Sequence, residues 1–296
     1  MKVVVSGSSG FLGTHLVRRL KERGHEVTRL VRRASEASDE STWDPYEGAV
    51  DRTLVGTADV VVSLAGSPTA GNPHSKKWAA ELRESRVTTT RLLADVIAEA
   101  ERPPAFLAGN GISYYGDRGS EVLTEDADSR EGSLLTDVTR DWQEAAEPAV
   151  RAGARTCVLR TAPVMDRRSA PLKLLLPLFK AGLGARLGDG SQYFPMISCR
   201  DWVAATVFAA EHDEVSGPLN LCCPDTPTNA EFTQALASAV RRRAFLAAPA
   251  FVVDKAGGAM SGEVLGSMRT RPKALEDAGF TFRDVDVRDV IATGLR

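Results

Sequence analysis

The stretch Gly7-Ser8-Ser9-Gly10-Phe11-Leu12-Gly13 follows directly on the apolar run Val3-Val4-Val5 at the start of the chain. This order predicts a buried strand, a tight glycine turn and then a helix. Glycine permits such a turn, and the absence of side chains lets a ligand approach the backbone closely. The first N–H groups of a helix lack partners within it and carry partial positive charge. The stretch therefore predicts a loop that holds the pyrophosphate of a dinucleotide.

The residues that follow favour this interpretation over glycines that merely form a turn. The spacing is Gly-x-x-Gly-x-x-Gly, which is looser than the Gly-x-Gly-x-x-Gly of many dehydrogenases. Leu12, Leu16 and Leu20 nevertheless fall on one helical face, and Gly24 is placed to end the helix. Residues 26–33 then have the pattern of a second strand. Together these segments predict a β-α-β unit.

The end of that second strand bears on which dinucleotide is bound. A carboxylate there would accept hydrogen bonds from ribose hydroxyls, whereas cationic side chains suit an additional 2′-phosphate. The chain has Arg32 and Arg33 at this place. Between Gly13 and Arg33 the carboxylates are Glu22, in the helix, and Glu26, at the start of the strand, so none lies at the strand's end. Arginine can clamp a phosphate with two hydrogen bonds. We therefore expect NADP(H), and the alternative is that both arginines are simply solvated.

The composition limits the classes of partner. The 296 residues carry a formal net charge of −2, so we expect no nucleic-acid partner. The chain opens with a strand rather than a secretory signal, and no apolar run has the length of a membrane span, so a cytoplasmic protein without membrane contact is expected. The four cysteines form no Cys-x-x-Cys pair and suggest no metal. The sequence does not predict an oligomeric state.

Strand and helix patterns alternate through the first half of the chain, which predicts a doubly wound parallel sheet of the Rossmann type. Strands are expected at residues 59–66, 105–112, 155–162 and 219–223, and helices at 75–101, 134–151 and 200–211. Ligands of such sheets bind at the carboxyl ends of the strands. The candidate positions there are Leu64-Ala65-Gly66, Asn110-Gly111 and Thr161-Ala162-Pro163-Val164. Small residues at these ends would also suit tight loop packing without a ligand.

The pattern changes after Pro163, with an amphipathic segment at residues 171–183, a Gly/Pro-rich loop at 184–195 and a helix after Asn229. We expect residues 1–165, completed by about 196–223, to form a dinucleotide-binding domain. Residues 166–195 and 224–296 are expected to form a smaller, interleaved C-terminal lobe for a small-molecule substrate.

Several motifs together resemble the extended and atypical short-chain dehydrogenase/reductase superfamily, and within it the branch of NAD(P)-dependent epimerase/dehydratase-like "epimerase family" proteins. They are the glycine loop, Leu64-Ala65-Gly66, Ser85-Arg86-Val87-Thr88-Thr89-Thr90-Arg91, Tyr114-Tyr115-Gly116, Arg140-Asp141-Trp142, Arg160-Thr161 and Thr228-Asn229-Ala230-Glu231-Phe232-Thr233. The resemblance spans nearly the whole chain. It implies a nucleotide-binding domain with an interleaved substrate lobe and NADP(H) as cofactor. The expected cofactor contacts then include Arg86 and Gly109 as well as the glycine loop, Arg32, Arg33 and the strand ends.

The chain departs from this superfamily in its acid–base residues. The superfamily uses a Tyr for proton transfer and a Lys four residues later that lowers the pKa of the phenol. None of the four tyrosines has a Lys at that distance. If Glu144 marks the usual position after that Lys, Thr136 and Arg140 fill the two slots. A threonine hydroxyl is too weak an acid to replace a phenol near neutral pH.

Four residues are the remaining catalytic candidates: Asn110, Tyr114, Tyr115 and Arg140. Asn110 stands where the branch pattern has Ser, and its amide can donate to a carbonyl but cannot supply a proton. Tyr114 and Tyr115 are the phenols near the expected reactive face, with Arg140 and Glu144 as groups that could shift a pKa. Alternatively, one tyrosine packs against the nicotinamide or the core and the other faces solvent.

Three functions follow from these observations. The first is an NADP(H)-dependent oxidoreductase with an atypical proton donor, and the second is a catalytically silent protein that senses NADPH. The third is a nucleotide-sugar epimerase, which resembles this chain at residues 188–195 but carries an Arg for the diphosphate where Phe194 stands here. The missing Tyr–Lys pair and Phe194 both disfavour the epimerase.

Overall fold

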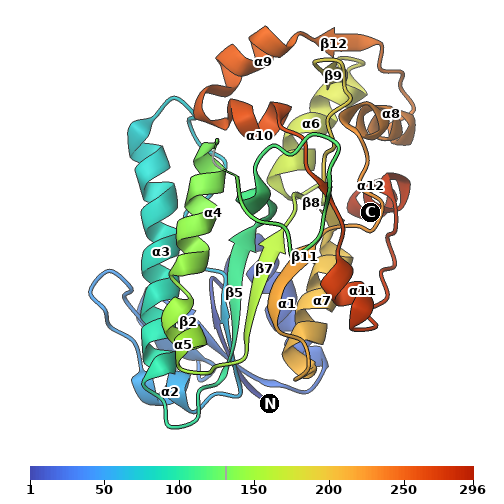
Figure 1. Cartoon of the computed structure of the whole chain (residues 1–296). Coiled ribbons are helices and arrows are strands. Elements are labelled where there is room, and N and C mark those ends of the chain that lie inside the picture. Colours follow the sequence, from blue (N-terminus) through green and yellow to red (C-terminus); the bar gives the residue numbers. More distant parts are fainter. Residues whose placement is uncertain (131) are drawn as a thin grey trace.

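The central feature of the computed structural model, which describes residues 1–130 and 132–296, is a seven-stranded parallel sheet (Figure 1). The strand order is β11-β7-β5-β4-β1-β2-β3. The chain therefore starts in the middle of the sheet and builds outward in both directions, which confirms the doubly wound fold. The strands are β1 (Lys2–Ser6), β2 (Glu26–Val31), β3 (Glu40–Thr42), β4 (Val60–Ser63), β5 (Ala105–Gly111), β7 (Thr156–Thr161) and β11 (Gly217–Leu221).

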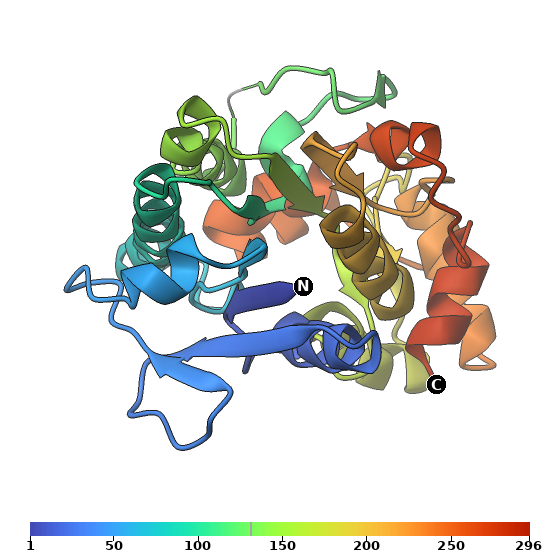
Figure 2. The same ribbon diagram turned by 90° about the horizontal axis from the view of Figure 1, so that it is seen from below.

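Helices cover both faces of this sheet (Figure 2). Side chains alternate along β1, so Val3 and Val5 enter one apolar core while Val4 enters the other. The first core includes residues of α1 and α7, and the second includes residues of α2, α3 and α5. Burial on both faces explains the uninterrupted valine runs of the central strands, residues 3–5 in β1 and 60–62 in β4. The covering helices are α1 (Phe11–Glu22), α2 (Arg52–Gly56), α3 (Lys76–Ala98), α4 (Leu134–Glu144), α5 (Glu147–Arg151) and α7 (Cys199–Glu211).

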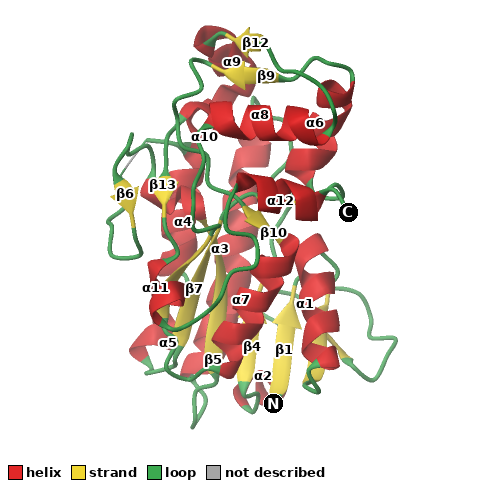
Figure 3. Cartoon of the chain, turned by 90° about the vertical axis from the view of Figure 1, so that its right-hand side faces the viewer, coloured by secondary structure: helices red, strands yellow, loops and turns green. Residues whose placement is uncertain are grey.

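The remaining elements lie mainly beyond the carboxyl ends of the sheet strands (Figure 3). A separate apolar core joins α6, α8 and α12 through residues such as Leu176, Phe232 and Ile291. Three short two-stranded pairs complete this part, β8 with β10, β9 with β12 and β6 with β13. These elements are β6 (Val122–Leu123), β8 (Val164–Met165), α6 (Ala170–Lys180), β9 (Ala185–Leu187), β10 (Ile197–Ser198), α8 (Asn229–Ala239), β12 (Leu246–Ala248), α9 (Ala250–Gly257), α10 (Ser261–Leu265), β13 (Arg269–Thr270), α11 (Lys273–Asp277) and α12 (Val287–Gly294), with single 3₁₀ turns at Ile112–Tyr115 and Gly258–Met260.

Two sequence predictions of elements are wrong. The single helix expected at residues 134–151 is divided into α4 and α5, because Pro148 stands in the first turn of α5 and cannot continue α4. The loop expected at residues 184–195 contains β9, which pairs in parallel with β12 about sixty residues later. Short strands of this kind depend on a distant partner rather than on local pattern.

The division of the chain into a dinucleotide-binding domain and a substrate lobe stays a prediction. Within the described residues, no helix combines the length and the apolar character needed to cross a bilayer.

Candidate functional site

The glycine loop forms a close-packed cradle at the start of α1. Gly7 has a φ of +69°, and a Cβ atom there would lie 2.5 Å from the backbone carbonyl of Leu64. Gly10 is the N-cap of α1 and supplies no side-chain cap, and the first turn of the helix contains no acidic residue. Ser9 and Gly10 are exposed, whereas Ser8 is buried. The helix therefore offers uncapped N–H groups and a positive dipole end at an open surface, which suits an anion.

The end of β4 forms the next wall of this site. Gly66 leaves room for Arg86 of α3, because a Cβ on Gly66 would lie 3.1 Å from Cγ of Arg86. Ala65 accepts a hydrogen bond from Thr89 Oγ1 through its carbonyl, at 3.1 Å, which fixes the strand end to the same helix. The structure thus brings the glycine loop, residues 64–66 and Arg86 together, as the sequence analysis expects.

Arg86 is a cation without an acidic partner among the described residues. Its guanidinium donates to the Leu82 carbonyl at 2.9 Å and to Thr69 Oγ1 at 3.0 Å, and it lies 5.2 Å from the Trp142 ring centroid. Burial lowers the pKa of Arg86 to about 10, so the side chain is still charged at neutral pH. A partly buried cation whose neighbours are neutral is suited to bind an anionic ligand group.

The segment after β7 carries the next predicted cofactor residues. Val164 belongs to the apolar core against which Phe11, Leu12 and Leu64 also pack. Hydrogen bonds fix the three residues before it. Trp202 Nε1 donates to Thr161 Oγ1 at 3.0 Å. The Ala162 N–H donates to the Leu221 carbonyl, and the Pro163 carbonyl accepts from the Ile197 N–H.

Arg168 is a candidate that sequence reasoning missed. Its guanidinium lies 5.6 Å from the Phe11 ring centroid, and Asp166 binds it at 2.7 Å. Because both Asp166 oxygens accept from the guanidinium, Arg168 brings a neutralised ion pair rather than a net positive charge to the start of α1. It stands more than 150 residues from Phe11 in the sequence, and no local pattern around it points to the glycine loop.

The two arginines after β2 differ in their surroundings. Arg33 makes a two-point ion pair with Glu40, with N–O distances of 2.9 and 2.7 Å. Arg32 is exposed and has no ion-pair or hydrogen-bond partner within residues 1–130 and 132–296. Of the two guanidinium groups, Arg32 is therefore the one that is free to meet a phosphate without first leaving a carboxylate.

Two other predicted site residues are explained by packing. A Cβ on Gly109 would lie 2.6 Å from the Ser63 carbonyl and 3.0 Å from the Trp142 ring, so this glycine allows β4, β5 and α4 to approach. Asn110 is buried, and its amide donates to the Thr139 carbonyl at 3.1 Å while its Oδ1 accepts from the Gly111 N–H at 2.7 Å. Both residues fasten β5 to its neighbours, and this placement does not require a ligand.

The environment of Tyr115 corrects the interpretation of this residue as a proton donor. The side chain is 0% exposed, and its hydroxyl donates to Asn220 Oδ1 and accepts from Arg160 Nη1, both at 2.7 Å. Burial raises the pKa of Tyr115 to about 12, against the weaker opposing effect of Arg160. A phenol enclosed in this way does not reach a substrate, so the alternative that one tyrosine packs in the core applies to Tyr115.

We expect Tyr115→Phe to lower the free energy of unfolding by about 1–3 kcal/mol, because Asn220 and Arg160 each lose a buried partner. Thermal and urea unfolding monitored by circular dichroism would measure the change. Tyr114→Phe is the matched control, because the Tyr114 hydroxyl makes no hydrogen bond within the part of the chain that the structure describes. Equal stability of the two variants would contradict this account of Tyr115.

Tyr114 and Arg140 are the two other catalytic candidates, and neither is enclosed as Tyr115 is. Tyr114 is half-buried, and the Arg160 guanidinium lies 3.7 Å from its ring centroid. Arg140 is exposed on α4, four residues after Thr136. Thr136 itself is 0% exposed and its Oγ1 hydrogen-bonds Ser133 Oγ at 2.7 Å.

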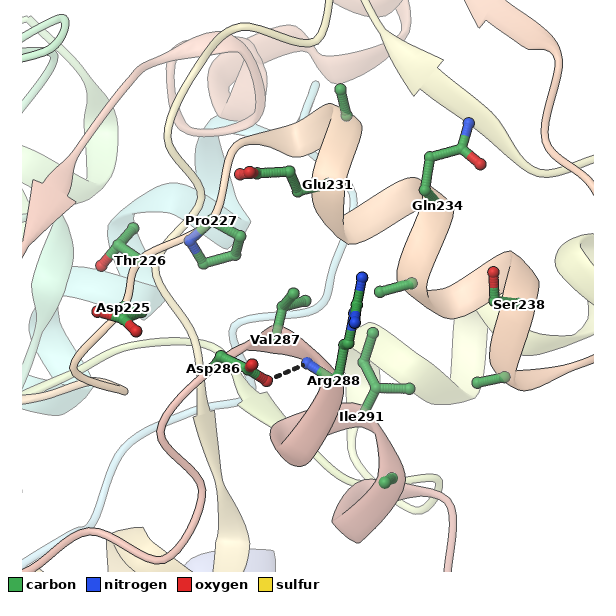
Figure 4. Close-up of a pocket in the computed structure, with 14 residues that line it drawn as sticks. Asp225, Thr226, Pro227, Glu231, Gln234, Ser238, Asp286, Val287, Arg288 and Ile291 are labelled. Atoms are coloured by element: carbon green, nitrogen blue, oxygen red, sulfur yellow. Dashed lines mark hydrogen bonds between the residues drawn. The ribbon is translucent and has the colours of Figure 1, made fainter.

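A hollow of about 880 Å³ on the C-terminal part lies between α8 and α12 and contains none of the predicted site residues (Figure 4). Its lining includes Glu231, Gln234 and Arg288 around an apolar floor. Phe194, which stands where nucleotide-sugar epimerases carry an Arg, packs against the adjacent core with its ring 5.1 Å from that of Phe232.

The chain is similar in sequence to known proteins over most of its length. Residues 3–222 match the family described as the NAD dependent epimerase/dehydratase family, and residues 248–293 match a domain of unknown function, DUF1731. The chain is 37% identical over 291 residues to the epimerase family protein ML0860 of Mycobacterium leprae, covering 98% of this chain and 94% of that protein. It is 34% identical over 262 residues to the human epimerase family protein SDR39U1, covering 87% of each.

Solved structures of epimerase proteins are also similar to this chain. The crystal structure of human epimerase family protein SDR39U1 with NADPH is similar over 99% of both chains, with a TM-score of 0.87 and 30% identity. A nucleoside-diphosphate sugar epimerase from Corynebacterium glutamicum is similar over 99% of this chain and 58% of its own, with a TM-score of 0.81 and 33% identity. The resemblance to the epimerase branch of the dehydrogenase/reductase superfamily is confirmed. By these matches and by its fold, the chain belongs to the NAD dependent epimerase/dehydratase family.

Proposed function

We propose that this chain binds NADP(H) and works as an oxidoreductase, or as an epimerase-like enzyme, on a small molecule without the Tyr-x-x-x-Lys pair. The observation that carries the proposal is the cradle formed by Gly7, Gly10 and the uncapped start of α1. A pyrophosphate fits there because the backbone is accessible and the helix dipole is favourable. The crystal structure of a relative at 30% identity contains NADPH, which supports the choice of cofactor.

The residues that would hold the cofactor are those that surround this cradle. The glycine loop would bind the pyrophosphate, Arg32 would bind the 2′-phosphate, and Arg86 would contribute positive charge. A bound nicotinamide supplies or accepts a hydride, and the protein has to orient it and transfer the matching proton.

The thiols and the net charge bear on the compartment and the substrate class of the protein. All four cysteines are free thiols, which fits a reducing compartment such as the cytoplasm. The net charge of −2 supports a small-molecule substrate rather than a nucleic acid.

A fluorescence titration with NADPH and NADH tests the cofactor. We expect the wild-type chain to prefer NADPH, and Arg32→Ala to weaken NADPH binding about fivefold, which corresponds to about 1 kcal/mol for an exposed ion pair. Arg33→Ala should weaken it less, because Arg33 is bound to Glu40. Affinity for NADH should change in neither variant. Equal affinity of the wild-type chain for the two cofactors would refute the choice of NADP(H).

A second candidate function is a silent protein that binds NADPH and reports its level. Thr136 in the tyrosine slot and Arg140 in the lysine slot favour this alternative, because neither residue type replaces its counterpart chemically. Absorbance of NADPH, followed with phenanthrenequinone, nitrobenzaldehyde and cyclohexanone, separates the two functions. Binding of NADPH without turnover of any of these carbonyl compounds would favour the sensor.

A further inference from the structure

A glutamate from the C-terminal part hydrogen-bonds the start of α4. Glu263 lies on α10, and its Oε1 accepts hydrogen bonds from the hydroxyl of Ser133 and from the Leu135 N–H, the latter at 3.2 Å. The hydroxyl of Ser113, just beyond β5, is a further polar neighbour that favours the ionised form and lowers the pKa of this carboxyl. Glu263 lies about 130–150 residues after Ser113 and Ser133 in the sequence, so the fold brings distant segments together here.

Hydroxyl groups connect Glu263 to the tyrosine slot. Ser133 Oγ, which bonds Glu263, also bonds Thr136 Oγ1 at 2.7 Å. With Glu144 taken as the marker of the position after the superfamily's Lys, Thr136 stands in the slot that a phenol occupies there. The carboxyl group is therefore one hydroxyl away from that slot, on the side that faces the C-terminal part. Figure 1 shows α10 above the upper end of α4, beyond the carboxyl ends of β5 and β7.

The region next to Ser133 is open to small molecules. A hollow of about 690 Å³ is lined by Gly132, Ser133, Leu134 and Asp137 at the start of α4. Ser133 thus belongs both to this hollow and to the hydrogen-bond chain of Glu263. Glu263 is not itself part of this lining, so a substrate or a water molecule in the hollow would meet the carboxyl group through the Ser133 hydroxyl.

The surroundings of Glu263 favour its protonated form. Burial raises the pKa of Glu263, and Ser133, Ser113 and the Leu135 N–H lower it to a smaller extent. All three groups are neutral, so burial is not offset by a cation as it is in an ion pair. Glu263 therefore keeps its proton to a higher pH than an ordinary glutamate, and an acid–base residue near neutral pH needs this property. The titratable side chains on the segments around α10 are His74, Asp117, Asp137, Arg140, Asp254 and Lys255.

We propose that Glu263 is the proton donor of this chain in carbonyl reduction and the proton acceptor in the reverse oxidation. The proposal rests on the oxidoreductase function proposed above. In the reduction, the O–H bond of the carboxylic acid breaks and a new O–H bond forms on the substrate carbonyl oxygen. The hydride that reaches the carbonyl carbon comes from the reduced cofactor, and the carboxylate regains its proton from water in the hollow at Ser133. Glu263 thus performs the task that the superfamily gives to its tyrosine.

The alternative is that Glu263 only fastens α10 to the start of α4. Ser133 already caps α4, because its Oγ accepts from the Thr136 N–H at 3.1 Å, so the helix does not depend on the carboxylate for its cap. Glu263→Gln separates the two roles. Glutamine has nearly the same shape and can still accept the hydrogen bonds of Ser133 and Leu135, but it cannot donate a proton as an acid.

The decisive experiment compares Glu263→Gln with wild type and with the control Glu101→Gln, an exposed glutamate beyond α3. The probes are NADPH with phenanthrenequinone, nitrobenzaldehyde and cyclohexanone. We expect unchanged NADPH affinity and melting temperature in all three proteins, and a loss of turnover of about 100-fold or more in Glu263→Gln alone. Turnover by wild type that Glu263→Gln retains, or that Tyr114→Phe abolishes instead, would overturn the role of Glu263 while leaving the oxidoreductase function intact.

A second measurement does not depend on turnover. Infrared difference spectra between wild type and Glu263→Gln, recorded as a pH titration, should contain the carbonyl stretch of a protonated carboxylic acid. This band should disappear at a higher pH than that of an ordinary glutamate. Its disappearance at the ordinary pH would overturn the proposal. If wild type binds NADPH and reduces none of the probes, the oxidoreductase function fails and the role of Glu263 fails with it.

Discussion

Gly7→Ala is expected to lower the affinity for NADPH by about 100-fold, because the loss of two charge-assisted hydrogen bonds costs about 3 kcal/mol. Gly7 has a left-handed φ of +69°, and the added methyl group would lie 2.5 Å from the Leu64 carbonyl and 2.7 Å from the Ala65 N atom. Both neighbours are backbone atoms, so the end of β4 or the loop itself has to move. Either movement displaces the N–H groups that face the ligand.

Gly24→Ala is the control for the backbone cost. Gly24 also has a left-handed φ, +82°, but the added methyl group would meet nothing within 4 Å. Gly24→Ala should therefore lose about 1 kcal/mol of stability from the strained φ alone. Gly7→Ala should lose more stability, because the clash with the end of β4 adds to the same φ cost, and only Gly7→Ala should lose binding in a fluorescence titration at a temperature where both variants are folded. Equal affinity of the two variants for NADPH would show that the glycine loop is not the pyrophosphate site.

The sheet and its covering helices could be predicted from sequence because short apolar runs indicate the strands and apolar residues at helical spacing indicate the helices. Val3, Val4 and Val5 are all buried since the strand is covered on both faces, and the turn to α1 needs the left-handed Gly7. The division between α4 and α5 also has a local signal, because Pro148 favours the first turn of a new helix over the interior of a longer one. Pairs such as β9 with β12 have no comparable local signal.

The site was predictable only where it is made of one continuous segment. The glycine loop and the end of β4 follow their own strands, so the topology of the sheet brings them to one edge. Arg168 and Glu263 arrive from segments far along the chain, and their partners at Phe11 and Ser133 cannot be inferred from spacing. Tyr115 shows the opposite error. Its motif resembles a site, but Arg160 on β7 and Asn220 on β11 enclose its hydroxyl in the core.

Arg86→Met is expected to weaken NADPH binding roughly 30-fold, which corresponds to about 2 kcal/mol for a hydrogen bond to a charged group. The pKa of about 10 means that Arg86 remains a cation at neutral pH although burial disfavours its charge. Removing a desolvated cation relieves a cost in the folded state, and this gain offsets the lost hydrogen bonds to Leu82 and Thr69. The melting temperature should therefore change little while the affinity falls.

Arg83→Met is the matched control on the same helix, because Arg83 is exposed and forms an ion pair with Asp141 at the surface. Its loss should change neither affinity nor stability appreciably, since exposed ion pairs contribute little. Titration with NADPH at two salt concentrations adds a second criterion, because the contribution of a partly buried cation is screened less than that of an exposed one. If Arg86→Met instead unfolds at a lower temperature and binds NADPH normally, Arg86 is a structural link between α3 and residues 66–69, and the anion at this edge of the sheet is held by the glycine loop without it.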